Sequence, residues 1–235
     1  MSIDKTKILA LIPGRGGSKN PPNKNILPFK GKPLIVHSIE HALRARHIGR
    51  IIVSTDSEEI AEIARQSGAE VPFIRPSEIA GDFSTDLEVF QHALSWLDKH
   101  EGYRPEIIVH LRPTSPIRPH ALVDEGIVRL HGCPEADALR TVVLAPQTPY
   151  KMWWLKGDFL EPLIMHPTYQ EPYNMPRQLL PDIYWQNAYL DITRWNTVML
   201  KRSMTGGRIL ALVMSPEENV DIDSEYDLTK AARRN

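Results

Sequence analysis

The sequence predicts an α/β fold built on a mostly parallel β-sheet, and three observations support this prediction. Short apolar runs alternate with longer amphipathic runs over residues 7–145. Serine or proline stands where two of the amphipathic runs begin, and glycine where they end, as is typical of helix termini. Strands separated by helices of these lengths form βαβ units, in which the strands run parallel. In such sheets, ligand-binding groups gather at the carboxyl ends of the strands.

Each element is assigned from its own periodicity and boundaries. The apolar runs predict strands at 7–13, 50–55, 71–74, 106–111 and 137–145. The amphipathic runs predict helices at 34–46, 57–68, 84–100 and 119–132. Later in the chain, two further strands are expected at 183–192 and 208–214.

The composition limits the class of protein. The 235 residues suffice for one large α/β domain or for a domain with an appended lobe. A net charge of −1 creates no general attraction for nucleic acid or an anionic membrane. Cys133 is the only cysteine, which excludes a disulfide framework and a cysteine-based zinc site. The apolar run near the N-terminus is too short for a signal peptide or a membrane span. We therefore expect a cytoplasmic protein with no nucleic-acid or membrane partner.

The alternating pattern breaks at the segment PQTPYKMWWLKGDFLEPLI, which predicts a β-hairpin with its turn at KGD. The next segment, HPTYQEPYNMPRQLLPD, is rich in proline, tyrosine and glutamine and has no periodicity. We expect residues 1–145 and 183–235 to form the α/β domain and residues 146–182 to form an inserted lobe. The lobe's aromatic residues indicate contact with a partner subunit.

Residues 12–25, IPGRGGSKNPPNKN, follow the first predicted strand directly. Their glycines allow tight turns and let backbone N–H groups approach an anion. Arg15, Lys19 and Lys24 add positive charge. The segment predicts a cradle for more than one phosphate, although it matches neither the P-loop nor the dinucleotide-binding motif. An ordinary surface loop with incidental basic residues is the alternative.

Two further segments carry candidate ligand groups. Asp221 and Asp223 are two residues apart, so on an extended segment their carboxylates share one face and are suited to Mg²⁺. Alternatively they are the N-terminal charges of a helix, and the two interpretations are compatible. The segment HLRPTSPIRP places Thr114 and Ser115 at a predicted strand end, with Arg112 beside them. A turn with a helix N-cap is the alternative there.

With these segments identified, the chain resembles the acylneuraminate cytidylyltransferases, the CMP-sialic acid synthetase family. The resemblance extends over nearly the whole chain and rests on motifs that occur in the family's order. They are GRGGSKNPPNKN, IIVSTD, RPSEIAGD, RPTSPIR, PRQLLP and VDIDSEYDL. The resemblance implies a Rossmann-like domain and a homodimer formed by the inserted lobe.

The resemblance also implies roles for individual residues. The nucleotide would be held by Gly14, Arg15, Ser18, Lys19, Lys24, Asn25 and Arg75. The catalytic set would be Arg15, Lys19, Lys24 and Asp223, and Mg²⁺ would be bound by Asp221 and Asp223. The sugar side would comprise Arg112, Thr114, Ser115, Arg177, Gln178, Asn187 and Asp191.

The sugar side departs from the family pattern. Arg112 stands where the family typically has glutamine, and the family's NGAIY reads NAYLD here, which places Asp191 in the tyrosine position. A guanidinium fork is suited to a carboxylate or phosphate, so we hypothesise that the acceptor differs from sialic acid.

The predicted function is transfer of CMP from CTP to an acidic sugar with release of pyrophosphate. The acceptor would be an N-acylneuraminate or a related nonulosonic or 3-deoxy-ulosonic acid. A nucleotidyltransferase acting on a sugar phosphate, possibly with GTP, is the first alternative. A nucleotide-binding regulatory protein is the second, although binding alone would not require the pair of aspartates.

Overall fold

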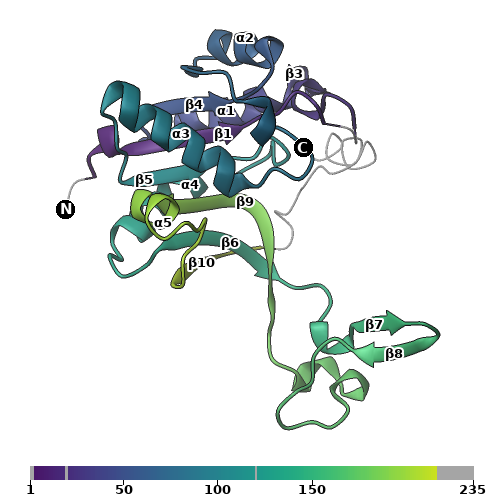
Figure 1. Cartoon of the computed structure of the whole chain (residues 1–235). Helices are drawn as coiled ribbons and strands as arrows, with labels where there is room; N and C mark the ends of the chain where they lie inside the picture. Colours follow the sequence, from purple (N-terminus) through teal and green to yellow (C-terminus); the bar gives the residue numbers. More distant parts are fainter. Residues whose placement is uncertain (1–2, 19–20, 120, 216–235) are drawn as a thin grey trace.

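The computed structural model describes residues 3–18, 21–119 and 121–215. Within these residues a six-stranded sheet forms the centre of the molecule (Figure 1). Its strands are β1 (Ile8–Pro13), β4 (Arg50–Ser54), β5 (Ile107–His110), β6 (Ala138–Leu144), β9 (Tyr184–Arg194) and β10 (Ile209–Met214). They are arranged in the order β10-β6-β9-β5-β1-β4. Among the described strands of this six-stranded sheet, β9 alone runs antiparallel to its neighbours, so the predicted mostly parallel sheet is confirmed.

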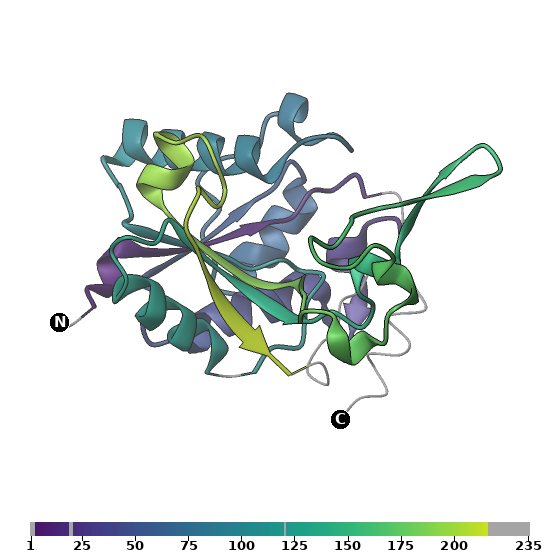
Figure 2. The same ribbon diagram turned by 90° about the horizontal axis from the view of Figure 1, so that it is seen from below.

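Helices cover both faces of this sheet (Figure 2). They are α1 (Leu34–Arg44), α2 (Glu58–Gln66), α3 (Asp86–Glu101), α4 (Leu122–His131) and α5 (Trp195–Met199). Alternate residues of β1 enter two hydrophobic clusters, one with α1, α2 and α4 and the other with α3 and α5. Strand β1 is therefore buried on both faces, which explains its continuous apolar sequence. The described part of the chain has no helix that is both long and apolar enough to cross a membrane.

The predicted signals at the termini of α2 are confirmed, whereas α4 begins at Leu122 with Ala121 as its N-cap and not at the predicted Pro119. The Ser57 hydroxyl accepts a hydrogen bond from the Ile60 N–H at the start of α2. Thr85 and Glu88 form a capping box at the start of α3, which satisfies two N–H groups that the helix leaves unpaired. The chain leaves α2 through Gly68 at φ +94°, a conformation that favours glycine.

One predicted strand is wrong. Residues 71–74 form no strand, and a single bridge between Ile52 and Glu70 is the only β pairing next to them in the described chain. Pro72 has no N–H to continue a ladder beyond that bridge. Two short elements that the periodicity did not predict also occur, the two-stranded pair β2 (Pro28–Phe29) and β3 (Lys32–Pro33) and the helix α5.

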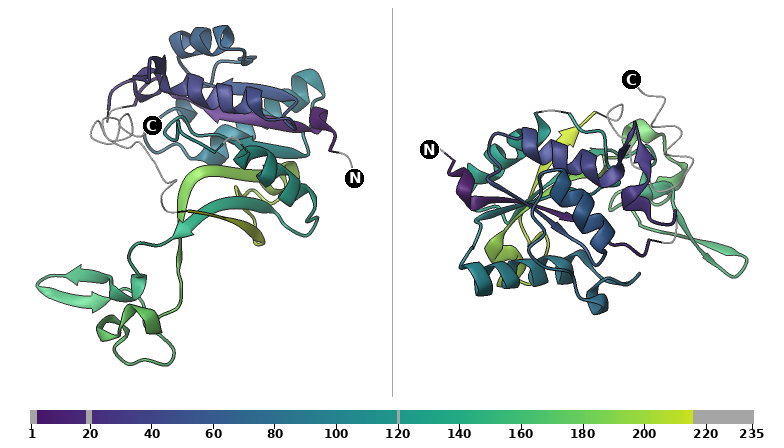
Figure 3. Two further views of the ribbon diagram at one scale, coloured as in Figure 1. Left: turned by 180° about the vertical axis from the view of Figure 1, so that it is seen from behind. Right: turned by 90° about the horizontal axis from the view of Figure 1, so that it is seen from above.

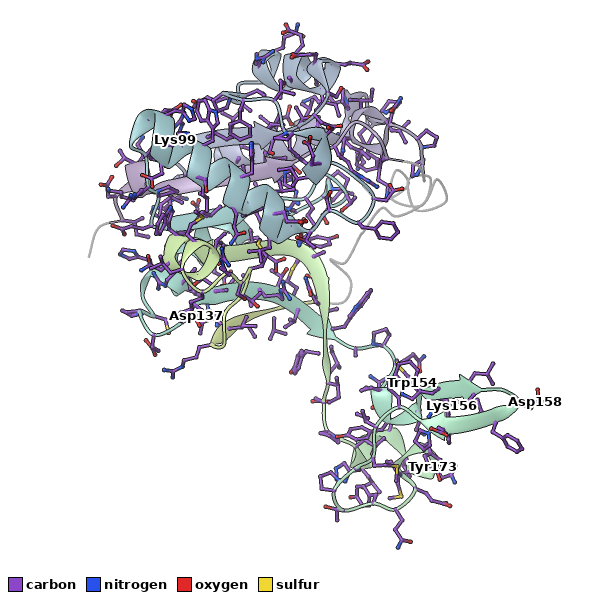
Figure 4. All side chains as sticks on the ribbon, in the orientation of Figure 1. Lys99, Asp137, Trp154, Lys156, Asp158 and Tyr173 are labelled. Carbon is purple, nitrogen blue, oxygen red and sulfur yellow. The ribbon has the colours of Figure 1, made fainter. Side chains whose placement is uncertain are left out.

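Residues 146–182 leave the sheet after β6 and return to it through β9 (Figures 1 and 3). They include the predicted hairpin, with strands β7 (Trp153–Lys156) and β8 (Phe159–Pro162) and Gly157 in the turn at φ +62°. The segment projects from the helices and the sheet, and Figure 4 shows Trp154 and Tyr173 within it. Its exposed apolar side chains include Trp154, Leu155, Phe159 and Leu160. We call residues 146–182 the lobe, and its role in dimerisation stays a prediction.

Candidate functional site

A cavity of about 270 Å³ lies where β1 and β5 end. Its wall includes Arg15, Asn25, Arg75, Asp82, Asp86 and Arg112, together with Thr114. Of the predicted site residues, Arg15, Asn25, Arg75, Arg112 and Thr114 therefore lie together at the predicted edge of the sheet. Lys19, Asp221 and Asp223 lie outside the described residues.

The loop after β1 is held by hydrogen bonds to its surroundings. The Gly14 N–H donates to the Ser54 carbonyl at 3.0 Å, and the Gly16 N–H donates to an Asp56 carboxylate oxygen at 2.9 Å. A Cβ on Gly14 would lie 2.7 Å from the Ile35 side chain, so glycine is needed there for close packing against α1. These two N–H groups already have protein acceptors, so in this conformation they are not available to an anion.

Asn25 and Ser18 stabilise the same loop from within. The buried Asn25 side chain donates to the Arg15 carbonyl at 2.8 Å. The Ser18 hydroxyl accepts from the Lys24 N–H at 2.6 Å and donates to the Pro21 carbonyl at 3.2 Å. Both residues thus fix the backbone that carries the basic side chains; direct contact with a nucleotide stays a prediction for each.

Arg15 and Arg75 place positive charge on the cavity in different ways. Arg15 forms an ion pair with Asp82 at 2.8 Å, and the two side chains are 30% and 33% exposed. Arg75 is buried and donates to the Ser54 hydroxyl at 3.1 Å and to the Ser54 carbonyl. Burial lowers the pKa of Arg75 from its ordinary value, against the attraction of nearby carboxylates. Arg75 is therefore fixed in the wall, whereas Arg15 lies at the opening.

Arg112 has two carboxylate partners that the sequence did not indicate. Its Nη1 donates to Asp191 at 2.7 Å, and its Nη2 donates to Asp86 at 3.0 Å. Asp191 also accepts a hydrogen bond from the Arg140 Nε at 2.7 Å. Burial alone would raise the pKa of Asp191, but the positive charges around it hold that pKa below its usual range. The expected fork facing an acceptor is thus engaged with the protein's own carboxylates.

His110 lies behind this group of charges. Its ring is buried against Phe90, with ring centroids 4.7 Å apart, and neither ring nitrogen has a hydrogen-bond partner among the described residues. Burial lowers the pKa of His110 to about 4, so the imidazole is neutral at pH 7. A neutral ring at this position leaves the Asp86 charge to be balanced by Arg112.

The other predicted residues of the sugar side lie away from the cavity wall or behind it. Ser115 is fully buried, and its hydroxyl has no hydrogen-bond partner among the described residues. Asn187 is buried in β9. Arg177 donates to the carbonyls of Pro146 and Ala145 at 2.9 and 2.8 Å, which ties the lobe to the end of β6. Gln178 is exposed on the lobe.

Sequence reasoning missed Asp82, Asp86 and Arg140. Asp82 lies within the quoted motif RPSEIAGD, and Asp86 lies in the first turn of a predicted helix, where an acidic residue has an ordinary explanation. Arg140 carried a clearer signal, because it is the one charged residue in the largely apolar strand segment ALRTVVL. Such a residue needs a partner when the strand is buried.

Comparisons with known proteins identify the family of this chain. Residues 9–143 match the profile of a family described as cytidylyltransferase. The chain belongs to the cytidylyltransferase family. The family named from the motifs is thereby confirmed.

Curated relatives include several CMP-sugar synthases. The chain is 32% identical over 227 residues to an N-acylneuraminate cytidylyltransferase of Escherichia coli, an alignment covering 97% of this chain and 52% of the relative. It is 30% identical over 222 residues to a CMP-N,N'-diacetyllegionaminic acid synthase of Legionella pneumophila, covering 94% and 93% of the two chains. A pseudaminic acid cytidylyltransferase of Campylobacter jejuni is 45% identical over 91 residues, 39% of each chain. This chain spans about half the length of the Escherichia coli relative.

Solved structures share the fold. A CMP:2-keto-3-deoxy-manno-octonic acid synthetase complexed with CTP superposes with a TM-score of 0.69 over 96% of both chains, at 15% identity. A 4-diphosphocytidyl-2C-methyl-D-erythritol synthase from Anaerococcus prevotii gives a TM-score of 0.63 over 96% of both chains, at 13% identity. At these identities the likeness concerns the fold alone, and it confirms the predicted nucleotidyltransferase architecture.

Proposed function

We propose that this protein transfers CMP from CTP to an acidic sugar and releases pyrophosphate. The acceptor would be a nonulosonic or 3-deoxy-ulosonic acid. Membership of the cytidylyltransferase family supports the proposal, as do the names of relatives that align over most of this chain. The observation that carries it is the cavity at the carboxyl ends of β1 and β5, where three guanidiniums gather. A cytoplasmic location, where CTP is available, is part of the proposal.

The reaction would be a single displacement at phosphorus. An acceptor hydroxyl oxygen attacks the α-phosphorus of CTP and loses its proton to water. The bond from that phosphorus to the oxygen that bridges to the β-phosphate breaks, and pyrophosphate leaves with that electron pair. The protein's part is positioning and charge compensation, so a covalent nucleophile is not needed. Arg15 at the cavity opening and Lys24 in the same loop would offset charge on the triphosphate and on departing pyrophosphate.

Magnesium is part of the proposal through residues outside the described chain. The described residues contain no group of three histidine, cysteine, aspartate or glutamate side chains able to hold a metal. Asp221 and Asp223 offer the carboxylate oxygens that Mg²⁺ prefers, and bound Mg²⁺ would neutralise phosphate charge. Asp223→Asn should therefore abolish turnover and weaken Mg²⁺ binding measured by calorimetry. Full activity of this variant would remove the assignment.

The decisive experiment measures pyrophosphate release. CTP, GTP, ATP and UTP would each be combined with N-acetylneuraminic, pseudaminic, legionaminic and 3-deoxy-manno-octulosonic acids and with sugar 1-phosphates. We expect turnover with CTP and at least one of the acids. Turnover with GTP and a sugar phosphate would support the first alternative. Tight nucleotide binding with no turnover in any pair would support the regulatory alternative.

We also propose a homodimer formed through the lobe. Trp154, Leu155 and Phe159 are 57%, 72% and 79% exposed on a hairpin that the rest of the described chain does not cover. Exposed apolar groups gathered in this way are typical of subunit interfaces. Analytical ultracentrifugation should show a dimer for the wild type and a monomer for Trp154→Glu. Lys99→Glu on α3, a surface change far from the lobe (Figure 4), should leave the dimer intact. A monomeric wild type would contradict the proposal.

A further inference from the structure

Strand β9 departs from regular pairing where it passes β6. Arg140 is paired with Asp191 and Val142 with Gln186, so residues 187–190 of β9 lie opposite the single residue Thr141. Bulges of this kind are common beside active sites, where they redirect side chains. We call residues 187–190 the β9 bulge.

Side chains hold the backbone of the β9 bulge in one conformation. The Thr141 hydroxyl accepts from the Leu190 N–H at 3.0 Å and donates to the Leu190 carbonyl at 3.1 Å. The Tyr189 N–H donates to the Asn187 side chain at 3.4 Å, and its carbonyl accepts from the Arg118 Nε at 2.7 Å. Polar groups that the strand ladder leaves unpaired are therefore satisfied by neighbouring elements, as buried backbone requires.

Arg140 connects the two ends of this bulge. Its Nε donates to Asp191 at 2.7 Å, and its Nη1 donates to Gln186 at 2.8 Å. Asp191 accepts a second guanidinium, the Nη1 of Arg112 at 2.7 Å. We call these three residues the Arg112–Asp191–Arg140 clamp. It joins β9 and β6 to the segment that follows β5, and Arg112 lies in the cavity wall.

The charges of the clamp are balanced. Asp86 pairs with the remaining Nη2 of Arg112 at 3.0 Å, which gives two guanidiniums and two carboxylates in one group. The side chains of Arg112, Asp191 and Arg140 are only 21%, 10% and 25% exposed. An acceptor anion would gain less from a guanidinium that is already neutralised by carboxylates than from an unpaired one.

We propose that Arg140 is a positioning residue for acceptor selection: it closes the clamp, fixes the β9 bulge and sets the orientation of Arg112 at the cavity wall. The clamp acts by its geometry and does not attract the acceptor by its charge. The acceptor's hydroxyl and amide groups would meet polar groups held in fixed directions. This inference rests on the proposed function, which places the acceptor beside the nucleotide cavity.

Amide hydrogen exchange tests the clamp without any acceptor. In Arg140→Gln, we expect the amides of Tyr189 and Leu190 to exchange about tenfold faster than in the wild type, because the bulge opens more often. The amides of β1 should be unchanged. Arg140→Lys is the matched variant: it keeps the charge but lacks the fork that reaches both Asp191 and Gln186. It should exchange like Arg140→Gln. Unchanged exchange in both variants would overturn the proposal.

Steady-state kinetics separates geometry from charge by the direction of the effects. The acceptor is whichever acid of the panel the wild type uses most efficiently. Under the proposal, Arg140→Gln, Arg140→Lys and Asp191→Asn each raise the acceptor KM about tenfold and change the CTP KM little. If the clamp attracted an anionic acceptor, Arg140→Gln would raise the acceptor KM and Asp191→Asn would lower it. Wild-type behaviour of Arg140→Lys would also favour attraction and overturn positioning.

Hydrogen exchange and kinetics together distinguish a failure of the clamp proposal from a failure of the proposed function. If the wild type releases no pyrophosphate with any pair, the proposed function fails, while hydrogen exchange still decides whether Arg140 holds the bulge. If Asp191→Asn does not fold, Gln186→Leu is measured in its place. This change removes the hydrogen bond from Arg140 to Gln186 and leaves Asp191 intact. It should raise the acceptor KM in the same direction and by less. No change in KM or exchange would contradict the proposal.

Discussion

The proposed nucleotide side and the proposed acceptor side of the cavity differ in how Arg15 and Arg112 are held. On the nucleotide side, Arg15 pairs with Asp82, and both side chains are about one-third exposed. On the acceptor side, Arg112, Asp191 and Arg140 are mostly buried, and each of them contacts at least two partners. An exposed pair is weak and can exchange its partner, whereas a buried network is costly to disturb. Arg15 is therefore suited to exchanging Asp82 for a phosphate. Arg75 is buried and fixed, and so is the network around Arg112 on the proposed acceptor side.

The largest expected effect comes from removing the exchangeable cation. Arg15→Ala should lower kcat/KM for CTP about 10²- to 10³-fold, because a positioned donor to developing phosphate charge is lost. Its thermal midpoint should change little, since the side chain is partly exposed. Arg65→Ala, an exposed arginine on α2, is the control and should keep wild-type kinetics. A loss of less than about threefold in Arg15→Ala would exclude direct contact with the phosphates.

Removing Arg112 from the buried network should mainly lower the free energy of unfolding. Arg112→Gln leaves Asp86 and Asp191 with one partner fewer each, which should cost about 3 kcal/mol in the free energy of unfolding. Urea denaturation measures this, and Arg112→Gln with Asp86→Asn should recover part of the loss. Arg112→Gln should also raise the acceptor KM more than the CTP KM. Equal effects on both KM values would remove the distinction between the two sides.

Acid should lower the free energy of unfolding through the buried His110. The pKa of His110 is about 4 in the folded protein against 6.5 ordinarily, so the unfolded chain binds a proton that the folded chain does not. The contribution of His110 to the free energy of unfolding has its full value above pH 6.5 and is lost as pH falls toward 4. It amounts to about 2 kcal/mol between pH 8 and pH 5. His41, whose pKa burial also lowers to about 4, acts in the same direction.

Urea midpoints at pH 8 and pH 5 provide the measurement for His110. In His110→Leu the urea midpoints at pH 8 and pH 5 should differ less than in the wild type, because a group that titrates only in the unfolded chain has been removed. An unchanged difference would show that His110 takes up a proton in the folded protein. Asp86, whose Oδ2 lies 4.0 Å from the His110 Nδ1, would be the partner of that proton.

A smaller effect is expected within the β9 bulge. Ala188 has φ +59°, a conformation that is strained for residues with a Cβ, and the family resemblance places glycine at this position. Ala188→Gly should raise the free energy of unfolding by about 0.5–1 kcal/mol, since relief of strain outweighs added chain entropy. Ala10→Gly in the regular strand β1 is the control and should destabilise the protein. If both substitutions destabilise the protein, the backbone at Ala188 is not strained.

The smallest expected effect concerns Asp82. Asp82→Asn removes the competitor for Arg15, and an exposed ion pair contributes about 0–1 kcal/mol. The Kd for CTP should therefore fall about threefold in calorimetry without acceptor. An increase in Kd would show that Asp82 assists nucleotide binding rather than competing with it.

The sequence predicted the fold better than it predicted the contacts within the cavity wall. Periodicity and caps are local signals, and they located the strands and helices that later formed the sheet. The failed strand at 71–74 shows the limit, because pairing depends on a partner and Pro72 cannot continue one. The antiparallel direction of β9 is likewise a property of the sheet rather than of its own residues.

The acceptor side depends on contacts between distant segments. Arg112 was identified from its motif, but its partner Asp86 comes from α3 and the third member, Arg140, from β6. A single sequence does not reveal which charges share one carboxylate, since each residue has an ordinary explanation in its own element. Arg140 was the exception, because a charge inside an apolar strand indicates a buried partner.

The path of the chain through β6, the lobe and β9 has a consequence for how such proteins diverge. Strands β6 and β9 are antiparallel neighbours, so the lobe is topologically an enlarged loop of a β-hairpin. Each doubling of a loop's length costs only about 0.6 kcal/mol of closure entropy. The sheet therefore places little thermodynamic restriction on the length or sequence of the lobe. The length and sequence of such a loop can therefore change among related chains while the strands of the sheet stay unaltered.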